Sequence, residues 1–190
     1  MKIYLASSSE RRSALLTQIG LAHTVIKPHL REEPKEHELA HELAMRLAHE
    51  KALIAINKVK ELGGIVIAAD TVALFKGEIM GKPRSINGAA AMLEKLSGQK
   101  HEMITGFAII DIASGKTIID YEATTVEFRK LTEKEIKAYS KLNESRDAAG
   151  AYSIQKGAAK FVRRLEGEYT NVVGLPLGRI TEILNEEFKL

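Results

Sequence analysis

Residues 65–71 read Ile-Val-Ile-Ala-Ala-Asp-Thr, an unbroken apolar run that ends on a carboxylate and a hydroxyl. A short run of this kind, with β-branched residues, is typical of a strand that is covered on both faces. Another β-rich stretch follows at 72–75. Because open α/β sheets bind their ligands beyond the ends of such strands, we expect Asp70 to act as a general base or a metal ligand. The alternative is an aspartate that caps a turn.

The patterns on either side of this run predict a mixed α/β protein. Residues 38–62 place apolar side chains on one stripe of a long helix, which Gly63 and Gly64 end. Early strands alternate with helices, whereas two long β-rich stretches joined by a turn dominate later, so the sheet is not all-parallel. We expect a single domain over 1–190. The remaining expected elements are strands at 2–6, 24–26, 101–111, 117–128 and 160–165, and helices at 10–19, 87–96, after Thr132 and at 177–188.

Composition excludes several classes of protein. The 190 residues include no cysteine, which rules out disulfides, thiolate metal sites and cysteine nucleophiles. The basic residues behind the net charge of +3 are spread along the chain, and aromatic residues make up only 5%, which disfavours a nucleic-acid-binding regulator. No stretch approaches the ~20 apolar residues of a membrane helix, and the N-terminus does not resemble a signal peptide. We therefore expect a cytoplasmic protein without a membrane partner.

The stretch Ser-Ser-Ser-Glu-Arg-Arg at 7–12 lies at the junction of the first strand and the first helix. Free backbone N–H groups and the helix dipole favour anions at a helix N-terminus, and arginine can bind phosphate through two parallel hydrogen bonds. Ser8, Arg11 and Arg12 are therefore candidates for binding phosphate. The alternative, equally supported by these residues alone, is a capped helix with two solvated arginines.

Further candidates are isolated polar residues in loops and in the long helix. Lys51 lies in the helix, Lys82 in a Gly-Lys-Pro loop, and Glu32 in a polar loop where its carboxylate could hold a divalent cation. Gln155 ends the stretch 147–155, whose small residues let a ligand approach the backbone. Its amide can read both a donor and an acceptor on a base edge. Taken one at a time, each has the simpler interpretation of a solvated surface residue.

Taken together, these segments resemble the Maf family of nucleotide pyrophosphatases. The resemblance runs the length of the chain, and several long motifs in the right order are far more specific than any one of them. The matching motifs are LASSSERRSALL at 5–16, EKA at 50–52, AADTV at 68–72, MGKPRS at 80–85, LSGQKHEMITG at 96–106, DAAGAYSIQ at 147–155 and NVVGLPLGR at 171–179.

The resemblance implies a mixed, elongated β-sheet flanked by helices, with two lobes around a central cleft. It also implies hydrolysis of a nucleoside triphosphate to a nucleoside monophosphate and pyrophosphate, with Mg²⁺ or Mn²⁺ as cofactor. The segment that ends on Gln155 is similar to the branch that acts on dTTP, UTP and modified pyrimidine nucleotides, rather than the branch that prefers 7-methyl-GTP. The analogy also allows a homodimer.

The resemblance assigns a role to most of the candidate residues. Asp70 matches the proton acceptor, and Glu32, rather than its neighbour Glu33, matches a polar position that could complete the metal site with Asp70. The other matches are Arg11, Thr71 and Gln155 for the choice of base, and Lys51 and Lys82 for the polar lining of the pocket. Ser8 and Arg12 stay candidates for the substrate phosphates because they lie at the strand–helix junction.

A second hypothesis uses the same residues without catalysis. A nucleotide-binding regulator of cell division would need a pocket for the triphosphate but would not turn it over. Asp70 and Glu32 discriminate between the two hypotheses, because a protein that only binds has little use for carboxylates beside a triphosphate.

Overall fold

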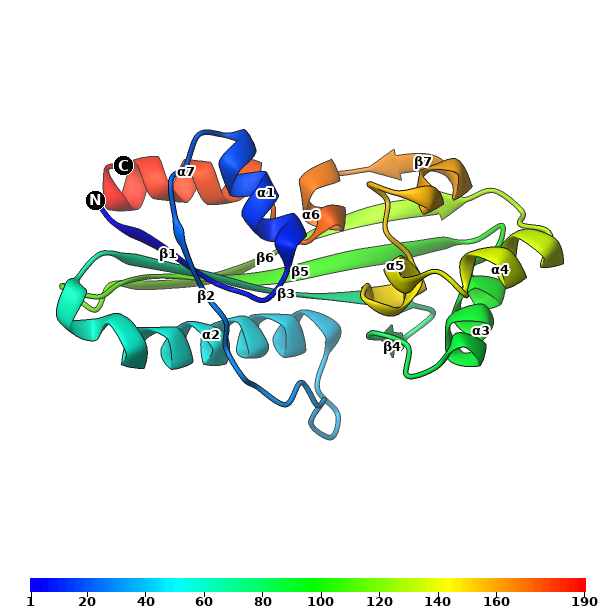
Figure 1. Cartoon of the computed structure of the whole chain (residues 1–190), viewed down its shortest axis with the longest axis horizontal. Coiled ribbons are helices and arrows are strands. Elements are labelled where there is room, and N and C mark those ends of the chain that lie inside the picture. Colours follow the sequence, from blue (N-terminus) through cyan, green and yellow to red (C-terminus); the bar gives the residue numbers. More distant parts are fainter. The chain divides into compact units, whose positions relative to one another are not determined.

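The computed structural model describes residues 1–190 (Figure 1). The strands are β1 (Ile3–Ala6), β2 (Thr24–Ile26), β3 (Ile65–Phe75), β4 (Glu78–Met80), β5 (Lys100–Asp111), β6 (Thr117–Phe128) and β7 (Val162–Glu166). The α-helices are α1 (Glu10–Gln18), α2 (Ala40–Val59), α3 (Ile86–Leu96), α4 (Glu133–Tyr139), α5 (Asn143–Arg146), α6 (Tyr169–Val173) and α7 (Leu177–Phe188). Short 3₁₀ helices are η1 (Lys60–Leu62), η2 (Ala149–Ala151) and η3 (Gly157–Phe161). None of the helices combines the length and the apolar character that crossing a bilayer demands.

The strands form one mixed sheet of seven strands in the order β2-β1-β3-β5-β6-β7, with β4 paired to β3 outside this path. Strand β1 runs parallel to both β2 and β3, whereas β3–β4 and β6–β7 are antiparallel. A mixed α/β sheet was expected from the change of pattern along the sequence, and the structure confirms it.

Strand β3 corrects one expectation about Asp70. The sequence pattern suggested a strand that ends at Asp70 and Thr71, but β3 runs without a break from Ile65 to Phe75, so Asp70 lies inside it. A carboxylate is tolerated in a buried strand only when it has a partner of opposite charge or hydrogen-bond donors. The structure supplies such a partner from another element, described below, so the carboxylate is compatible with a position inside the strand.

The chain forms two compact units. Unit 1 contains residues 1–70, 105–122 and 174–190, and unit 2 contains residues 71–104 and 123–173. Strands β3, β5 and β6 contribute residues to both. Each unit is discontinuous in sequence. The single domain and the central cleft stay predictions.

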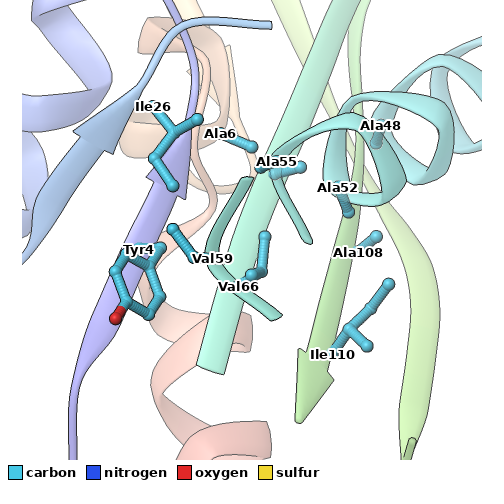
Figure 2. Packing of buried hydrophobic residues seen from close by; sticks show 11 residues of the cluster. Tyr4, Ala6, Ile26, Ala48, Ala52, Ala55, Val59, Val66, Ala108 and Ile110 are labelled. Carbon is cyan, nitrogen blue, oxygen red and sulfur yellow. The ribbon is translucent and has the colours of Figure 1, made fainter. Parts of the chain in front are cut away.

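In unit 1, α2 packs on one face of the strands through small side chains. Figure 1 shows α2 on one face and α1 and α7 on the other. Strand residues two apart share a face, and the alternate residues of β1, β3 and β5 meet the helix in a buried cluster (Figure 2). The cluster consists of Tyr4, Ala6, Ile26, Ala48, Ala52, Ala55, Val59, Val66, Ala68, Ala108 and Ile110. Because alanine side chains are short, the helix lies close to the sheet.

Gly106 marks a close approach of α2 to the sheet. A Cβ atom at this position of β5 would lie 2.3 Å from the backbone carbonyl carbon of Ala44 and 2.3 Å from the backbone nitrogen of Met45. Neither backbone atom can move without shifting α2. Only glycine therefore fits at position 106 without a steric clash.

We predict that Gly106→Ala lowers the free energy of unfolding by about 3 kcal/mol, because the new methyl group must push α2 away from the sheet. Urea denaturation followed by circular dichroism measures the change. Gly81→Ala is the matched control, since a Cβ atom there would meet nothing within 4 Å and the loss should stay below about 0.5 kcal/mol. Equal stabilities of the two variants would contradict the packing argument.

The core of unit 2 contains an aromatic cluster around a buried histidine. His101 Nε2 lies 2.8 Å from the hydroxyl of Tyr152. The His101 ring also packs edge-on against Tyr152 and Phe128, whereas its Nδ1 has no hydrogen-bond partner. Burial without a compensating charge disfavours the protonated ring and lowers the pKa of His101 to about 4.

This histidine predicts a loss of stability in acid. The unfolded protein takes up a proton on His101 below pH ~6.5, whereas the folded protein resists protonation until about pH 4. The free energy of unfolding should therefore fall between these values, and His101 should account for up to about 3 kcal/mol of the fall. The free energy of unfolding of His101→Gln, measured by urea denaturation at several pH values in this range, should lack the part of the fall that His101 causes. His29 is exposed and provides a control. The free energy of unfolding of His29→Gln should change with pH as it does in the wild type.

Candidate active site

Two periodic patterns bring Asp70 and Lys51 together inside unit 1. Asp70 follows Val66 and Ala68 on the face of β3 that meets α2. Lys51 lies three residues after Ala48, on the face of α2 that meets the sheet. The Lys51 Nζ atom lies 2.5 Å from Asp70 Oδ1, and both residues are only 6% exposed. The ion pair is therefore shielded from solvent on both sides.

Glu32 is the second carboxylate on the same ammonium group. Its Oε1 atom lies 2.5 Å from Lys51 Nζ, while its side chain is 42% exposed. Glu32 belongs to the loop between β2 and α2, so the two carboxylates reach Lys51 from different elements. Two negative charges thus converge on one buried positive charge.

Arg46 holds the loop segment that follows Glu32. Its guanidinium donates to both carboxylate oxygens of Glu38, over 2.6 and 2.8 Å, and to the backbone oxygen of Glu33 over 3.0 Å. A further bond of 3.1 Å joins it to Glu50 on the same helix. Charge-assisted bonds of this bidentate kind are strong and directional. Arg46 therefore ties the chain immediately after Glu32 to α2.

The electrostatics of Asp70 suit a proton acceptor. Burial raises the pKa of the Asp70 carboxyl, and the nearby charges of Lys51 and Arg12 offset part of that effect. Arg12 is itself held in place, because its Nε donates to the backbone oxygen of Gly174 over 2.6 Å and its Nη1 contacts Ser7 Oγ at 3.4 Å. The predicted junction of strand and helix thus contributes a fixed positive charge near the carboxylate.

The other residues of this junction lie nearer to solvent. Ser8 is exposed and Arg11 is half-buried at the start of α1, whereas Ser7 is buried and its Oγ accepts a hydrogen bond from the backbone N–H of Ser9 over 3.1 Å. The sequence singled out Ser8, yet Ser7 is the serine that makes the contact with Arg12.

Unit 2 holds a second set of predicted residues. Lys82 Nζ lies 3.0 Å from Asp147 Oδ1, and the backbone N–H of Gly150 donates to the carbonyl of Gly81 over 3.2 Å. The Gly-Lys-Pro loop and the stretch 147–155 are thereby joined, a contact that the sequence analysis did not predict. Gln155 is exposed at the end of that stretch.

Asp70 and Glu32 fit a divalent cation in their chemistry. No three side chains of histidine, aspartate or glutamate gather into a group that could hold a metal unaided. Mg²⁺, however, is usually bound through one or two carboxylates together with substrate phosphates. Two carboxylate oxygens that already converge on one cationic atom match this requirement.

The chain is similar to known proteins along almost its whole length. The family model described as Maf-like protein matches residues 2–187. The chain belongs to the Maf family. A dTTP/UTP pyrophosphatase of Clostridioides difficile is 40% identical over 100% of this chain and 97% of its own length. One from Acetivibrio thermocellus is 44% identical over 98% of this chain and 95% of its own length. Maf membership was the expectation from the motifs, and these matches confirm it.

A solved structure supports the fold of this Maf chain. The Ham1 protein of Staphylococcus aureus aligns with a TM-score of 0.52, covering 98% of this chain and 100% of that one, at 12% sequence identity. At that identity the likeness concerns the fold alone.

The structure of this Maf protein also adds residues that the sequence analysis missed. Arg46 and Ser7 hold parts of the site, and Asp147 is the partner of Lys82. Arg46 precedes the Glu-Lys-Ala motif by four residues, a helical spacing that places it beside Glu50. The sequence contains no comparable pattern that would predict the contacts of Arg46 with the loop.

We predict that Arg46→Ala releases the segment 32–38 from α2. Loss of its charge-assisted hydrogen bonds should raise amide hydrogen exchange in this segment by about tenfold or more, with little change in α2 itself. Exchange followed by mass spectrometry measures the effect. Arg31→Ala is the control on the same loop, because the exposed pair Arg31–Glu33 contributes little. The same exchange in both variants would show that Arg46 does not hold the loop.

Proposed function

We propose that this Maf-family enzyme hydrolyses dTTP, UTP and modified pyrimidine nucleoside triphosphates to the monophosphate and pyrophosphate. Relatives of at least 40% identity over nearly the full length carry the name dTTP/UTP pyrophosphatase. The observation that carries the proposal is the buried Asp70, whose raised pKa and paired lysine suit the activation of water beside a polyphosphate.

The reaction places specific demands on the residues of unit 1. Asp70 would orient a water molecule and accept its proton as the oxygen attacks the α-phosphorus. Arg11, Arg12 and Lys51 would offset the negative charges of the triphosphate and of the leaving pyrophosphate. Charged donors act most strongly where water is excluded, and Lys51 and Asp70 are both buried.

We further propose that Glu32 and Asp70 hold Mg²⁺ or Mn²⁺. When bound, such a cation neutralises charge on the phosphates and helps to orient them. Both carboxylates already contact the same positively charged atom, Lys51 Nζ, and a cation site likewise requires that they converge on one point.

The remaining assignments follow from the strand–helix junction for Ser8 and from the resemblance to the family for the others. We propose Ser8 and Lys82 as ligands of the substrate phosphates, and Thr71 and Gln155 as residues that select the pyrimidine base. The donor and acceptor of the Gln155 amide match the alternating edge of uracil or thymine. The cytoplasm as the place of the reaction and a homodimeric assembly stay predictions.

A regulator that binds nucleotide without turnover remains the competing function. The carboxylates favour the enzyme, because beside a triphosphate they repel the ligand unless a cation or a proton transfer uses them.

Pyrophosphate release from a panel of triphosphates tests the proposal. Purified protein should release pyrophosphate from dTTP and UTP faster than from CTP, dITP or 7-methyl-GTP, and only with Mg²⁺ or Mn²⁺ present. A preference for 7-methyl-GTP would leave the reaction in place but overturn the role of Gln155. Nucleotide binding without any release would favour the regulator.

Asp70→Asn links the reaction to its carboxylate. The amide is nearly isosteric but cannot accept a proton, so turnover should fall by a factor of about 10³ or more, while dTTP binding without a divalent cation, measured by calorimetry, changes little. Substantial turnover in this variant would refute the role of Asp70.

A further inference from the structure

The Lys51 ammonium occupies the point where two carboxylates converge. Its Nζ lies 2.5 Å from Asp70 Oδ1 and 2.5 Å from Glu32 Oε1. The side chain is buried, and burial of an ammonium is costly unless acidic groups surround it. In this arrangement Lys51 makes with the two carboxylates the contacts that a divalent cation would make.

We propose that Lys51 and the divalent cation exclude each other from the Glu32–Asp70 pair. In the arrangement described here, Lys51 neutralises the carboxylates and keeps free metal out. When the metal enters with a nucleotide, Lys51 leaves the pair, and its ammonium contacts the phosphates instead. This inference rests on the proposed function and adds an order of events to it: metal binds together with nucleotide and not before it.

Charge and flexibility both support the exchange. The pair carries two negative charges against the single charge of Lys51, whereas a divalent cation would bring two positive charges to the same oxygens. Ammonium and metal held side by side would repel each other strongly in a buried site. The lysine stem has four methylene groups and can swing without any movement of α2. Glu32 is 42% exposed, so the cluster opens to solvent on that side.

An alternative arrangement leaves Lys51 in place and binds the metal on the remaining carboxylate oxygens. In that case Lys51 does not compete with the metal for the carboxylates, and removal of its ammonium group should not create a new place for the metal. The two arrangements therefore predict different metal affinities for a variant without the charge at position 51.

Mn²⁺ binding in the absence of nucleotide, measured by electron paramagnetic resonance at pH 8, separates them. Lys51→Met keeps an unbranched side chain, one atom shorter, but removes the charge, and we expect it to bind Mn²⁺ about tenfold more tightly than the wild type, or better. Lys58→Met is the matched control on the same helix, because Lys58 is exposed and its Nζ donates to the backbone oxygen of Lys27 over 3.1 Å. Its Mn²⁺ affinity should equal that of the wild type.

An affinity of folded Lys51→Met that is equal to or weaker than the wild-type value would overturn the exchange. The double variant Lys51→Met with Glu32→Gln should lose the gain, which places the bound metal on this pair. If the single variant does not fold, the wild type decides: the nitrogen NMR signal of the Lys51 ammonium should shift on addition of Mg²⁺ with a non-hydrolysable dTTP analogue, and not with Mg²⁺ alone. A signal that stays unchanged with both would also reject the proposal.

These measurements are independent of pyrophosphate release. A wild type that releases pyrophosphate, with no gain of Mn²⁺ affinity in Lys51→Met, would reject the exchange and keep the proposed function. A gain of Mn²⁺ affinity in Lys51→Met, together with a wild type that releases no pyrophosphate from any triphosphate, would keep the exchange and reject the proposed function.

Discussion

The close approach of α2 to the sheet is the constraint on which the rest of the site depends. Gly106 and a row of alanines let the helix backbone come near β3 and β5. Lys51 lies on the same face of the helix, so its side chain is buried. A buried ammonium group requires a partner of opposite charge. Asp70 is that partner. Helix packing and the chemistry of the site are thus consequences of one interface.

The two carboxylates of the site are held in different ways. Asp70 is fixed by a strand that is hydrogen-bonded to its neighbours and buried, so its position is set by the core. Glu32 lies in a loop, and its position depends on the clamp that Arg46 makes with Glu33 and Glu38. Sites often combine a rigid element with a loop of lower local stability, which can rearrange when a ligand enters. Movement at this site is therefore expected on the side of Glu32.

Much of this geometry follows from the periodicity of the sequence. Alternation along β3 places Asp70 on the face of Ala68, and helical spacing places Lys51 on the face of Ala48, so their meeting could have been inferred. Asp70 was nevertheless expected at the end of a strand, because local patterns do not reveal a charge partner supplied by another element. The contacts of Glu32 and Arg46 could not be predicted, since they cross an irregular loop that has no period.

The burial of Lys51 beside Asp70 also limits how this protein can evolve. Substitution of either residue alone removes the buried partner of the other charge, which costs stability even though Glu32 still contacts Lys51 and Arg12 still lies near Asp70. Descendants that lose only one of them are therefore impaired in folding as well as in chemistry. The two positions are therefore expected to change together or not at all.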